Sequence, residues 1–281
     1  MPTPSSAFPV EFVDVARAFA TGTKKGDQQL RPVLRDVSLR VEAGEVVAIL
    51  GASGCGKSTL LRIAGGLDRP TSGATVIDGT AVTGVDARCA VGFQEPRLLP
   101  WRTLSANVSL GLPRGLDRRS GADRVAQLLD LVGLSASAGL RPREVSGGMA
   151  QRASLARALA RNPGVLLLDE PFGALDALTR LKMQDLLLDV HRAAPTTILL
   201  VTHDVDEALQ LADRIILLGA EEGQQGATIR RVLTVPGPRP RDRGSAELAE
   251  LRAELLDLLG IDRHGHARGV SATTTIPAFP Y

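Results

Sequence analysis

The chemistry in this sequence is concentrated in a glycine-rich stretch that follows five apolar residues, Val46–Leu50. The apolar run predicts a buried strand, the next residues match G-x-x-x-x-G-K-[ST], and helical spacing resumes at Leu60. Glycines allow backbone N–H groups to surround an anion, and the following helix turns its positive end toward the same point. The stretch therefore predicts a site for the phosphates of a nucleotide, where Lys57 reaches the β- and γ-phosphates and Ser58 coordinates Mg²⁺. The residues of this predicted phosphate loop are Gly51, Ala52, Ser53, Gly54, Cys55, Gly56, Lys57, Ser58 and Thr59.

Two carboxylates and a histidine follow other apolar runs. Asp169 and Glu170 come directly after Val165–Leu168, at a predicted carboxyl edge of the sheet, where α/β proteins bind ligands. Asp169 could hold Mg²⁺ through water, opposite Ser58, and Glu170 could orient or deprotonate an attacking water. His203 follows a further apolar run. A lone histidine at the end of a strand is more often structural or solvated than catalytic, so His203 needs support from its context.

That context is a resemblance to a known family. The segment Ser146–Arg152 reads S-G-G-M-A-Q-R, lies 23 residues before Asp169, and resembles the signature segment of ATP-binding-cassette (ABC) ATPases. Gln94 then matches the Q-loop of that family, Leu175-Asp176 its D-loop, and His203 its switch histidine. The order and spacing of the motifs agree with the family, and the resemblance extends from about residue 10 to about residue 260.

The resemblance implies a site shared between two chains. Two copies would stack head to tail around two ATP molecules, and the Ser146 hydroxyl with the N–H groups of Gly147 and Gly148 would grip the γ-phosphate bound by the other copy. Phosphoryl transfer depends on charge stabilisation more than on covalent help. The resemblance implies Lys57, Glu170 and His203 as catalytic residues and Ser58, Gln94 and Asp169 as residues around Mg²⁺.

Further positions take their roles from the same resemblance. Asp176 would link the two sites across the dimer interface, and Phe19 falls where the family places an aromatic ring that stacks on adenine, with core packing as the alternative. Two residues depart from the signature: Val145 stands where Leu is usual, and Met149 where Gln is usual. Val145 is an apolar exchange. Met149 lacks an amide, so a polar contact made there is lost or is taken over by Gln151, and activity is expected to survive.

The fold predicted around these motifs is α/β, an ABC-type nucleotide-binding domain of the P-loop NTPase class. It combines a mostly parallel RecA-like sheet, an antiparallel β-subdomain and a helical signature subdomain. The predicted strands are 10–15, 33–41, 46–50, 74–77, 89–93, 165–168, 197–201 and 215–218. Helices are predicted from 57, over 103–132 with a break at Pro113 and Gly115, over 147–161, over 175–192, from 204, and over 245–259.

The chain divides by composition into four predicted parts. Residues 1–8 are a disordered N-terminus, and 9–235 are the ABC ATPase domain, with its helical subdomain at about 95–162. A linker and helix follow over 236–262, and a flexible tail over 263–281. The pair His264 and His266 in this tail is a weak candidate for metal binding. The basic cluster 239–243 is interpreted as solvated, with contact to the bilayer surface or the permease as the alternative.

Bulk properties narrow the class of function. The 281 residues include 33 basic and 31 acidic side chains, a net charge of +2, which gives no support to nucleic acid as a partner. Two cysteines exclude a disulfide framework and favour a reducing compartment. The sequence shows no predicted membrane span or secretory signal. A transport role would therefore need separate membrane subunits, and the expected location is peripheral, at the cytoplasmic face of the cell membrane.

The resemblance also suggests which transport system. Permease subunits would dock near Gln94–Trp101, where the sole tryptophan lies in a proline-bounded loop, and a solute-binding protein would act indirectly. The segment Phe172–Arg180 resembles the importer branch for nitrate, taurine and aliphatic sulfonates, and Pro236–Arg241 is most similar to the aliphatic-sulfonate importers. ATP and Mg²⁺ are the implied cofactors.

Alternatives remain open at this point. The solute could instead be taurine or nitrate/bicarbonate, because an ATPase subunit does not touch the solute. A soluble ABC ATPase that acts on nucleic acid or ribosomes is disfavoured by the interval of 52 residues between Gln94 and Ser146, which contains no heptads, and by the single cassette.

Overall fold

The computed structural model of the protein describes residues 7–21 and 29–260. Its contacts group the chain into one compact unit that extends to Arg241 and a second that begins at Asp242. The predicted tail 263–281, with His264 and His266, lies outside the described residues, as does most of the predicted disordered N-terminus.

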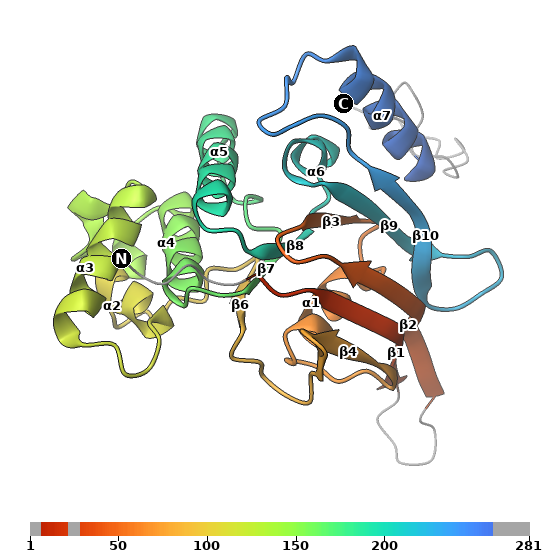
Figure 1. Cartoon of the computed structure of the whole chain (residues 1–281), viewed down its shortest axis with the longest axis horizontal. Helices are drawn as coiled ribbons and strands as arrows, with labels where there is room; N and C mark the ends of the chain where they lie inside the picture. The colour runs from red at the N-terminus through yellow and green to blue at the C-terminus, as the bar shows by residue number, and fades with distance from the viewer. Residues whose placement is uncertain (1–6, 22–28, 261–281) are drawn as a thin grey trace, which may run out of the picture. The chain divides into compact units, whose positions relative to one another are not determined.

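One sheet organises the first unit. Its described strands follow the order β5-β4-β1-β2-β10-β9-β3-β8-β7-β6 (Figure 1). Five neighbours run parallel, as the alternation of strands and helices predicts. They are β9 (Arg214–Ala220), β3 (Val46–Leu50), β8 (Thr197–Val201), β7 (Val165–Asp169) and β6 (Cys89–Gly92).

The antiparallel part confirms the predicted β-subdomain but is larger than expected. It comprises β1 (Val10–Thr21), β2 (Gln29–Val41), β4 (Ser72–Ile77) and β5 (Thr80–Ala81). The predicted strands 10–15 and 33–41 are too short, because the distal half of this β1–β2 pair is exposed and its register shifts interrupt the alternation of apolar residues. β1 therefore extends to Thr21, and β2 begins at Gln29.

Two strands, the two-residue β5 and the longer β10, lie outside the predicted ranges. β10 (Ala227–Thr234) pairs antiparallel with β9 and touches β2 at a single parallel position, Ala227 opposite Leu34. A register shift lies between Ile229 and Arg231, so the apolar side chains of this strand do not alternate regularly. Because of this shift, the segment lacks the alternation of apolar and polar residues by which a strand is predicted from sequence.

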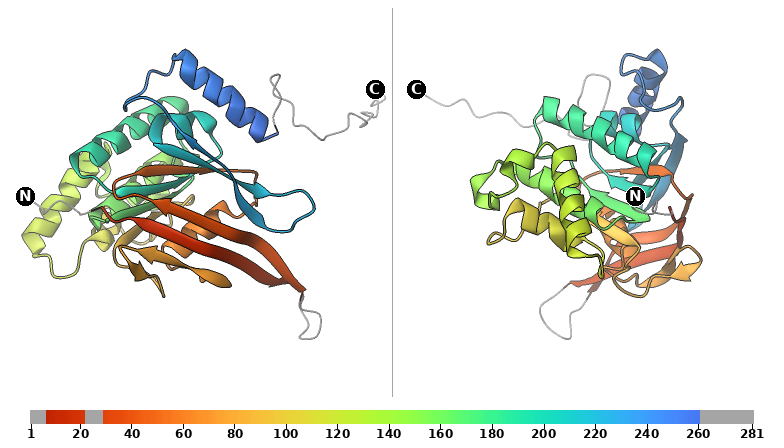
Figure 2. Two further views of the ribbon diagram at one scale, coloured as in Figure 1. Left: turned by 45° about the vertical axis from the view of Figure 1, so that its right-hand side comes forward. Right: turned by 60° about the vertical axis from the view of Figure 1, so that its left-hand side comes forward.

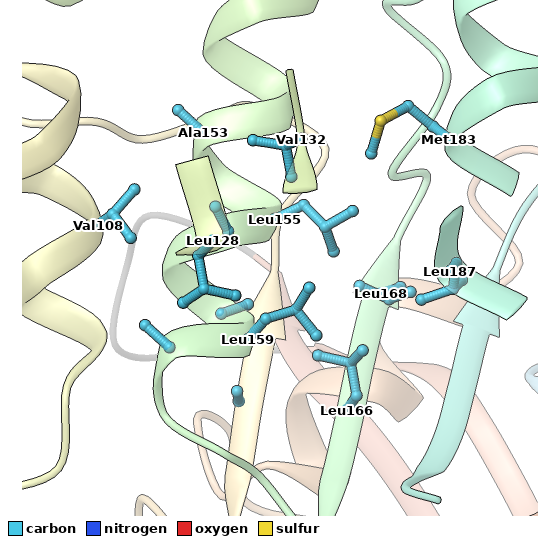
Figure 3. Close-up of a cluster of buried hydrophobic side chains, with 14 of the residues drawn as sticks. Val108, Leu128, Val132, Ala153, Leu155, Leu159, Leu166, Leu168, Met183 and Leu187 are labelled. Carbon is cyan, nitrogen blue, oxygen red and sulfur yellow. The ribbon is translucent and has the colours of Figure 1, made fainter. Parts of the chain in front are cut away.

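The central strands are buried on both faces. Along β7, Leu166 and Leu168 contribute to one apolar cluster, and Val165 and Leu167 to another. The first cluster joins the sheet to helices α2 to α5 and is drawn in Figure 3. The second joins the sheet to α1 (Lys57–Ala64) and to the antiparallel strands. Two-sided burial explains why these strands read as continuous apolar runs.

The helices confirm the predicted signature subdomain. α2 (Leu104–Val108), α3 (Arg118–Leu131) and α4 (Gly147–Ala160) lie side by side next to β6 (Figures 1 and 2). The predicted break at Pro113 falls between α2 and α3. Short 3₁₀ turns cover Ser109–Gly111, Ser135–Ser137 and Pro142–Glu144, while α5 (Ala177–Ala193) and α6 (Val205–Leu211) follow β7 and β8.

The second unit contains α7 (Ala246–Leu258), one residue shorter at each end than predicted. Among the described residues, none of the helices is both long and apolar enough to cross a bilayer.

Candidate functional site

The turn between β3 and α1 requires glycine at two positions. A Cβ on Gly51 would lie 2.2 Å from the carbonyl oxygen of Leu218, and one on Gly56 would lie 2.8 Å from Cδ2 of Leu34. Gly56 also has a φ of 107°, in the left-handed region, and it caps the start of α1. The loop therefore packs directly against β9 and β2, which leaves its concave side toward the carboxyl edge of the sheet.

Lys57 occupies the inside of this loop. Its side chain is 7% exposed, and Nζ donates hydrogen bonds to the carbonyl oxygens of Gly51 (2.8 Å) and Ala52 (3.0 Å). A buried ammonium group needs such acceptors, because an unpaired buried charge is strongly unfavourable. The charge is thus held at the place where a phosphate would enter.

The next residue joins the loop to β7. The Ser58 hydroxyl donates a 2.8 Å hydrogen bond to Oδ1 of Asp169, the last residue of that strand. Burial raises the pKa of Asp169, and the hydrogen bond from Ser58 opposes that effect. A hydroxyl and a carboxylate side by side form an oxygen donor set, which is the kind that Mg²⁺ prefers. These two residues fit the predicted metal site.

Glu170, which directly follows β7, contacts residues that follow β6 and β8. Its φ of 47° is unusual for a residue with a side chain, and its N–H donates to the carbonyl of Val201 at 2.9 Å. Oε2 accepts a hydrogen bond from Nε2 of Gln94 (2.9 Å) and lies 3.3 Å from Nδ1 of His203. The structure thus brings together the three side chains that the sequence placed after β6, β7 and β8.

Most of these groups, though not Gly51 or Asp169, line one cavity of about 570 Å³. It contains predicted phosphate-loop residues together with Gln94, Glu170 and His203, and Val33 of β2 is its apolar wall. The phosphate-loop residues that line it are Ser53, Gly54, Gly56, Lys57, Ser58 and Thr59.

The other predicted site residues do not line this cavity. Phe19 is 38% exposed and lies on β1, with the Arg17 guanidinium 4.1 Å from its ring centroid. Asp68 holds that guanidinium through contacts of 2.9 and 3.1 Å. One face of the Phe19 ring is therefore backed by a fixed cation.

The signature residues start helix α4. The Ser146 hydroxyl caps the helix by accepting the N–H of Met149 at 3.3 Å. The Met149 side chain packs against the apolar cluster of Figure 3, which explains why an apolar residue is accepted at this position. The Nε2 group of Gln151 donates to the carbonyl of Phe93 at 3.1 Å, while its buried Oε1 has no hydrogen-bond partner among the described residues. Gly147 lies at the exposed start of the helix.

The D-loop adjoins the start of the signature helix. A Cβ on Gly148 would lie 3.1 Å from Cδ2 of Leu175. Asp176 is exposed and caps α5 by accepting the N–H of Thr179 at 3.0 Å. Hydrogen bonds from Thr179 lower the pKa of Asp176. The Asp176 carboxylate is therefore already engaged within its own chain, as the N-cap of α5.

Sequence reasoning missed the contacts that hold the Q-loop. Arg157 of α4 donates to the carbonyls of Pro96 (2.8 Å) and Arg97 (2.9 Å), just beyond Gln94. Burial lowers the pKa of this arginine. Together with the hydrogen bond from Gln151, Arg157 ties the Q-loop to the signature helix. The sequence signal for this contact is weak: Arg157 stands between Ala156 and Ala158, but α4 also contains Gln151, Arg152 and Ser154.

The interpretation of 239–243 as solvated is wrong for the first two of its three arginines, Arg239 and Arg241. Arg241 is 9% exposed, and it donates to the backbone carbonyls of Leu209, Gln210, Val235 and Pro236. Arg239 pairs with Asp213 at 3.1 Å. Backbone carbonyls at the end of α6 are good acceptors for a cation, so these side chains fold back onto the protein.

Comparisons with known proteins identify the family of the chain. The sequence model of the ABC transporter family matches residues 34–173. The aliphatic sulfonates import ATP-binding protein SsuB 1 of Xanthomonas axonopodis pv. citri (strain 306) is 50% identical over 82% of this chain and 90% of its own length. A relative with the same name from Rhodococcus jostii (strain RHA1) is 52% identical, over 80% and 86% respectively.

Solved structures show the same fold. The ATP-binding cassette MJ0796, in a dimeric post-hydrolysis state with ADP and Pi, matches with a TM-score of 0.71 and 33% identity. The match covers 81% of this chain and 99% of that cassette. The chain therefore belongs to the ABC transporter family and is an ABC-type ATPase.

Proposed function

We propose that this chain is the ATP-hydrolysing subunit of an importer for small anions, with aliphatic sulfonates as the solute class. The observation that supports this most is the meeting of Ser58, Asp169, Glu170, Gln94 and His203 around the phosphate loop. The solute class rests on the names of relatives about 50% identical to this chain, and no residue of the described site distinguishes it from taurine or nitrate/bicarbonate.

The proposed roles follow from the contacts. Lys57 carries a fixed positive charge toward the β- and γ-phosphates, and the loop amides of residues 51–59 bind the same oxygens. Phe19, backed by Arg17, offers its ring to adenine. Ser58, Asp169 and Gln94 would hold Mg²⁺, which when bound neutralises phosphate charge. Their oxygen atoms suit that ion.

The hydrolytic step is assigned to Glu170. Its carboxylate accepts a proton from the attacking water, or orients that water by a hydrogen bond. Gln94 and His203 contact the same carboxylate oxygen, so both residues set its direction before water arrives. His203 is exposed on its other side, from which it can reach the phosphate that is transferred.

The second half of the proposed site comes from another copy. Ser146, Gly147 and Gly148 lie at the start of a helix, where N–H groups and the helix dipole favour an anion. These residues do not line the cavity of the phosphate loop in their own chain. A head-to-tail homodimer would place them there, with Asp176 at the interface.

Permease subunits are the proposed membrane partner. Trp101 is 68% exposed in the loop between β6 and α2, and it offers the large apolar surface that anchors many protein interfaces. This partner would hold the chain at the cytoplasmic face of the membrane, and a solute-binding protein would act through the permease.

Transport in a reconstituted system tests the function. The chain would be purified with the permease subunits and the solute-binding protein of its transport system, and placed in proteoliposomes. We expect ATP hydrolysis to rise when the binding protein is loaded with an alkanesulfonate, and to stay basal with nitrate. Stimulation by nitrate or taurine alone would overturn the solute class. No stimulation by any bound solute, with hydrolysis intact, would overturn the transport role.

A further inference from the structure

We propose that Arg180 is a positioning residue that couples the D-loop to the switch histidine within one chain. The D-loop is Leu175-Asp176, and the switch histidine is His203. On this proposal, contact of the D-loop with a second copy is transmitted through Arg180 to His203, so hydrolysis depends on assembly. The proposal rests on the head-to-tail dimer proposed above.

The first half of the coupling is at the D-loop. Arg180 lies on the first turn of α5, and its Nη2 donates to the carbonyl oxygen of Leu175 at 3.3 Å. The backbone N–H of Arg180 also donates to the carbonyl of Asp176 at 2.8 Å. A displacement of the D-loop therefore moves the guanidinium as well.

The second half is at the start of α6. Nη1 of Arg180 lies 3.2 Å from Oδ2 of Asp204, the residue that follows His203. The other oxygen of Asp204 accepts the N–H groups of Asp206 (2.9 Å) and Glu207 (3.2 Å), which caps α6. Both oxygens of one carboxylate are thus engaged, one by the helix and one by Arg180.

His203 is held between two fixed neighbours. The N–H of Asp204 donates to the hydroxyl of Thr202 at 3.0 Å, and that hydroxyl donates to Oε2 of the buried Glu207 at 2.8 Å. The backbone on both sides of His203 is therefore tied to α6. Because Arg180 holds Asp204, the side chain that contacts Glu170 at 3.3 Å takes its position from α5.

The guanidinium is not arranged for stability alone. Its Nε is buried and has no hydrogen-bond partner among the described residues, which carries a free-energy cost. The ion pair itself is partly exposed, with 33% and 28% of the two side chains accessible, and such pairs stabilise folded proteins little. A costly and weakly stabilising contact between two catalytic loops fits positioning better than packing.

The experiment measures kcat and KM for ATP in full-length variants. Arg180→Gln should lower kcat about tenfold, the effect of misplacing one hydrogen-bonding group in the transition state. KM should change less than twofold, because the phosphate loop is untouched. Arg180→Lys, which keeps the charge but not both contacts, should be intermediate. Arg192→Gln is the matched control on the same helix, since its ion pair with Asp189 is exposed, and should leave kcat unchanged.

The partner residue gives a second test. Asp204→Asn preserves a good helix cap but removes the ion pair, so it should lose as much kcat as Arg180→Gln. If Arg180 acts through Asp204, the double variant is no slower than either single variant. Additive losses, an unchanged kcat in Arg180→Gln, or a loss that lies entirely in KM would each overturn the coupling.

Assembly is measured separately in a Glu170→Gln background by light scattering at saturating ATP. A dimer with and without Arg180→Gln is expected, because Arg180 transmits assembly and does not create it. A Glu170→Gln chain that stays monomeric would overturn the proposed dimer and this coupling with it. A normal dimer together with an unchanged kcat in Arg180→Gln would overturn the coupling alone.

Discussion

The two halves of the proposed site differ in how completely one chain builds them. On the phosphate-loop side, hydrogen bonds of 2.8 to 3.0 Å join four residues to each other, to Gln94 or to nearby backbone. These residues are Lys57, Ser58, Asp169 and Glu170. On the signature side, Ser146 is exposed, and the described hydrogen bond of its hydroxyl is the local cap of its own helix. The phosphate-loop side is therefore the preorganised half, because one chain already fixes its side chains. The signature side is the outward half, because its residues do not line the cavity of their own chain.

This difference has a chemical consequence. A preorganised half can bind a nucleotide before assembly, since its charges already lie at the carboxyl edge of the sheet. The outward half adds N–H groups and a hydroxyl only when another copy approaches. Binding and hydrolysis would therefore be separate events, and substitutions in the two halves should affect them differently.

The largest effect is expected from the preorganised half. Glu170→Gln removes the base but keeps the hydrogen bond from Gln94, so hydrolysis should fall about 10³-fold while ATP affinity stays within twofold. Phosphate release and nucleotide binding measured on the same preparation would show this. Glu222→Gln, an exposed carboxylate elsewhere, is the control. Hydrolysis above a tenth of the wild-type rate would assign the base to another residue.

The preorganised half is also the half that sequence predicts best. Its residues follow short buried strands whose apolar runs are unambiguous, so the predicted Val46–Leu50 and Thr197–Val201 coincide with β3 and β8. Once the strands are parallel, residues after their carboxyl ends must share one edge. The contact between Ser58 and Asp169 follows from that geometry and the motif spacing.

What sequence did not reveal depends on long-range partners. The fold of Arg241 onto the carbonyls at the end of α6, and the contacts of Arg157 with the Q-loop, join segments far apart in the chain. An arginine reads as solvated unless its acceptors are known. β10 was missed because its register shift removes the alternation on which strand prediction relies.

The next largest effect is expected in the outward half. Ser146→Ala should lower hydrolysis about 100-fold, the scale for loss of one preorganised donor, without weakening ATP binding by a single chain. A mixture of Ser146→Ala chains and Glu170→Gln chains tests whether one site takes its two halves from different copies. In a mixed dimer, the Ser146→Ala chain keeps Glu170 and receives an intact Ser146 from its neighbour. Activity above the sum of the two separate variants is expected; no gain would mean that each chain builds its site alone.

A smaller effect is expected in the loop between β6 and α2, where the permease is proposed to dock. Trp101→Ala should weaken association with the permease about tenfold, because a large exposed ring is removed from the docking loop. Basal hydrolysis by the isolated chain should stay unchanged. Co-purification and surface binding with the permease would measure the first quantity, and Leu131→Ala, exposed on α3, serves as the control. Equal loss of association and basal activity would remove Trp101 from the docking role.

The smallest effect on hydrolysis is expected at Glu207, which supports the preorganised half from α6. This side chain is 4% exposed, and burial raises its pKa from 4.5 to about 8. Between pH 4.5 and 8 the folded chain therefore retains a proton that the unfolded chain has lost, so the free energy of unfolding falls as pH rises. At about 1.4 kcal/mol for each pKa unit, this loss is on the order of 5 kcal/mol across the window.

Glu207→Gln should remove that loss, because an amide stays neutral and can still accept the hydrogen bond from Thr202. Unfolding in urea at pH 6 and pH 8.5 measures it as the difference between wild type and variant, which cancels the contribution of other carboxylates. The wild type should lose more stability than the variant on going to pH 8.5, while hydrolysis at pH 6 stays within twofold. Equal losses of stability in the wild type and the variant would mean that Glu207 is ionised in the folded chain. The preorganised half would then contain a buried carboxylate held by the hydrogen bond from Thr202.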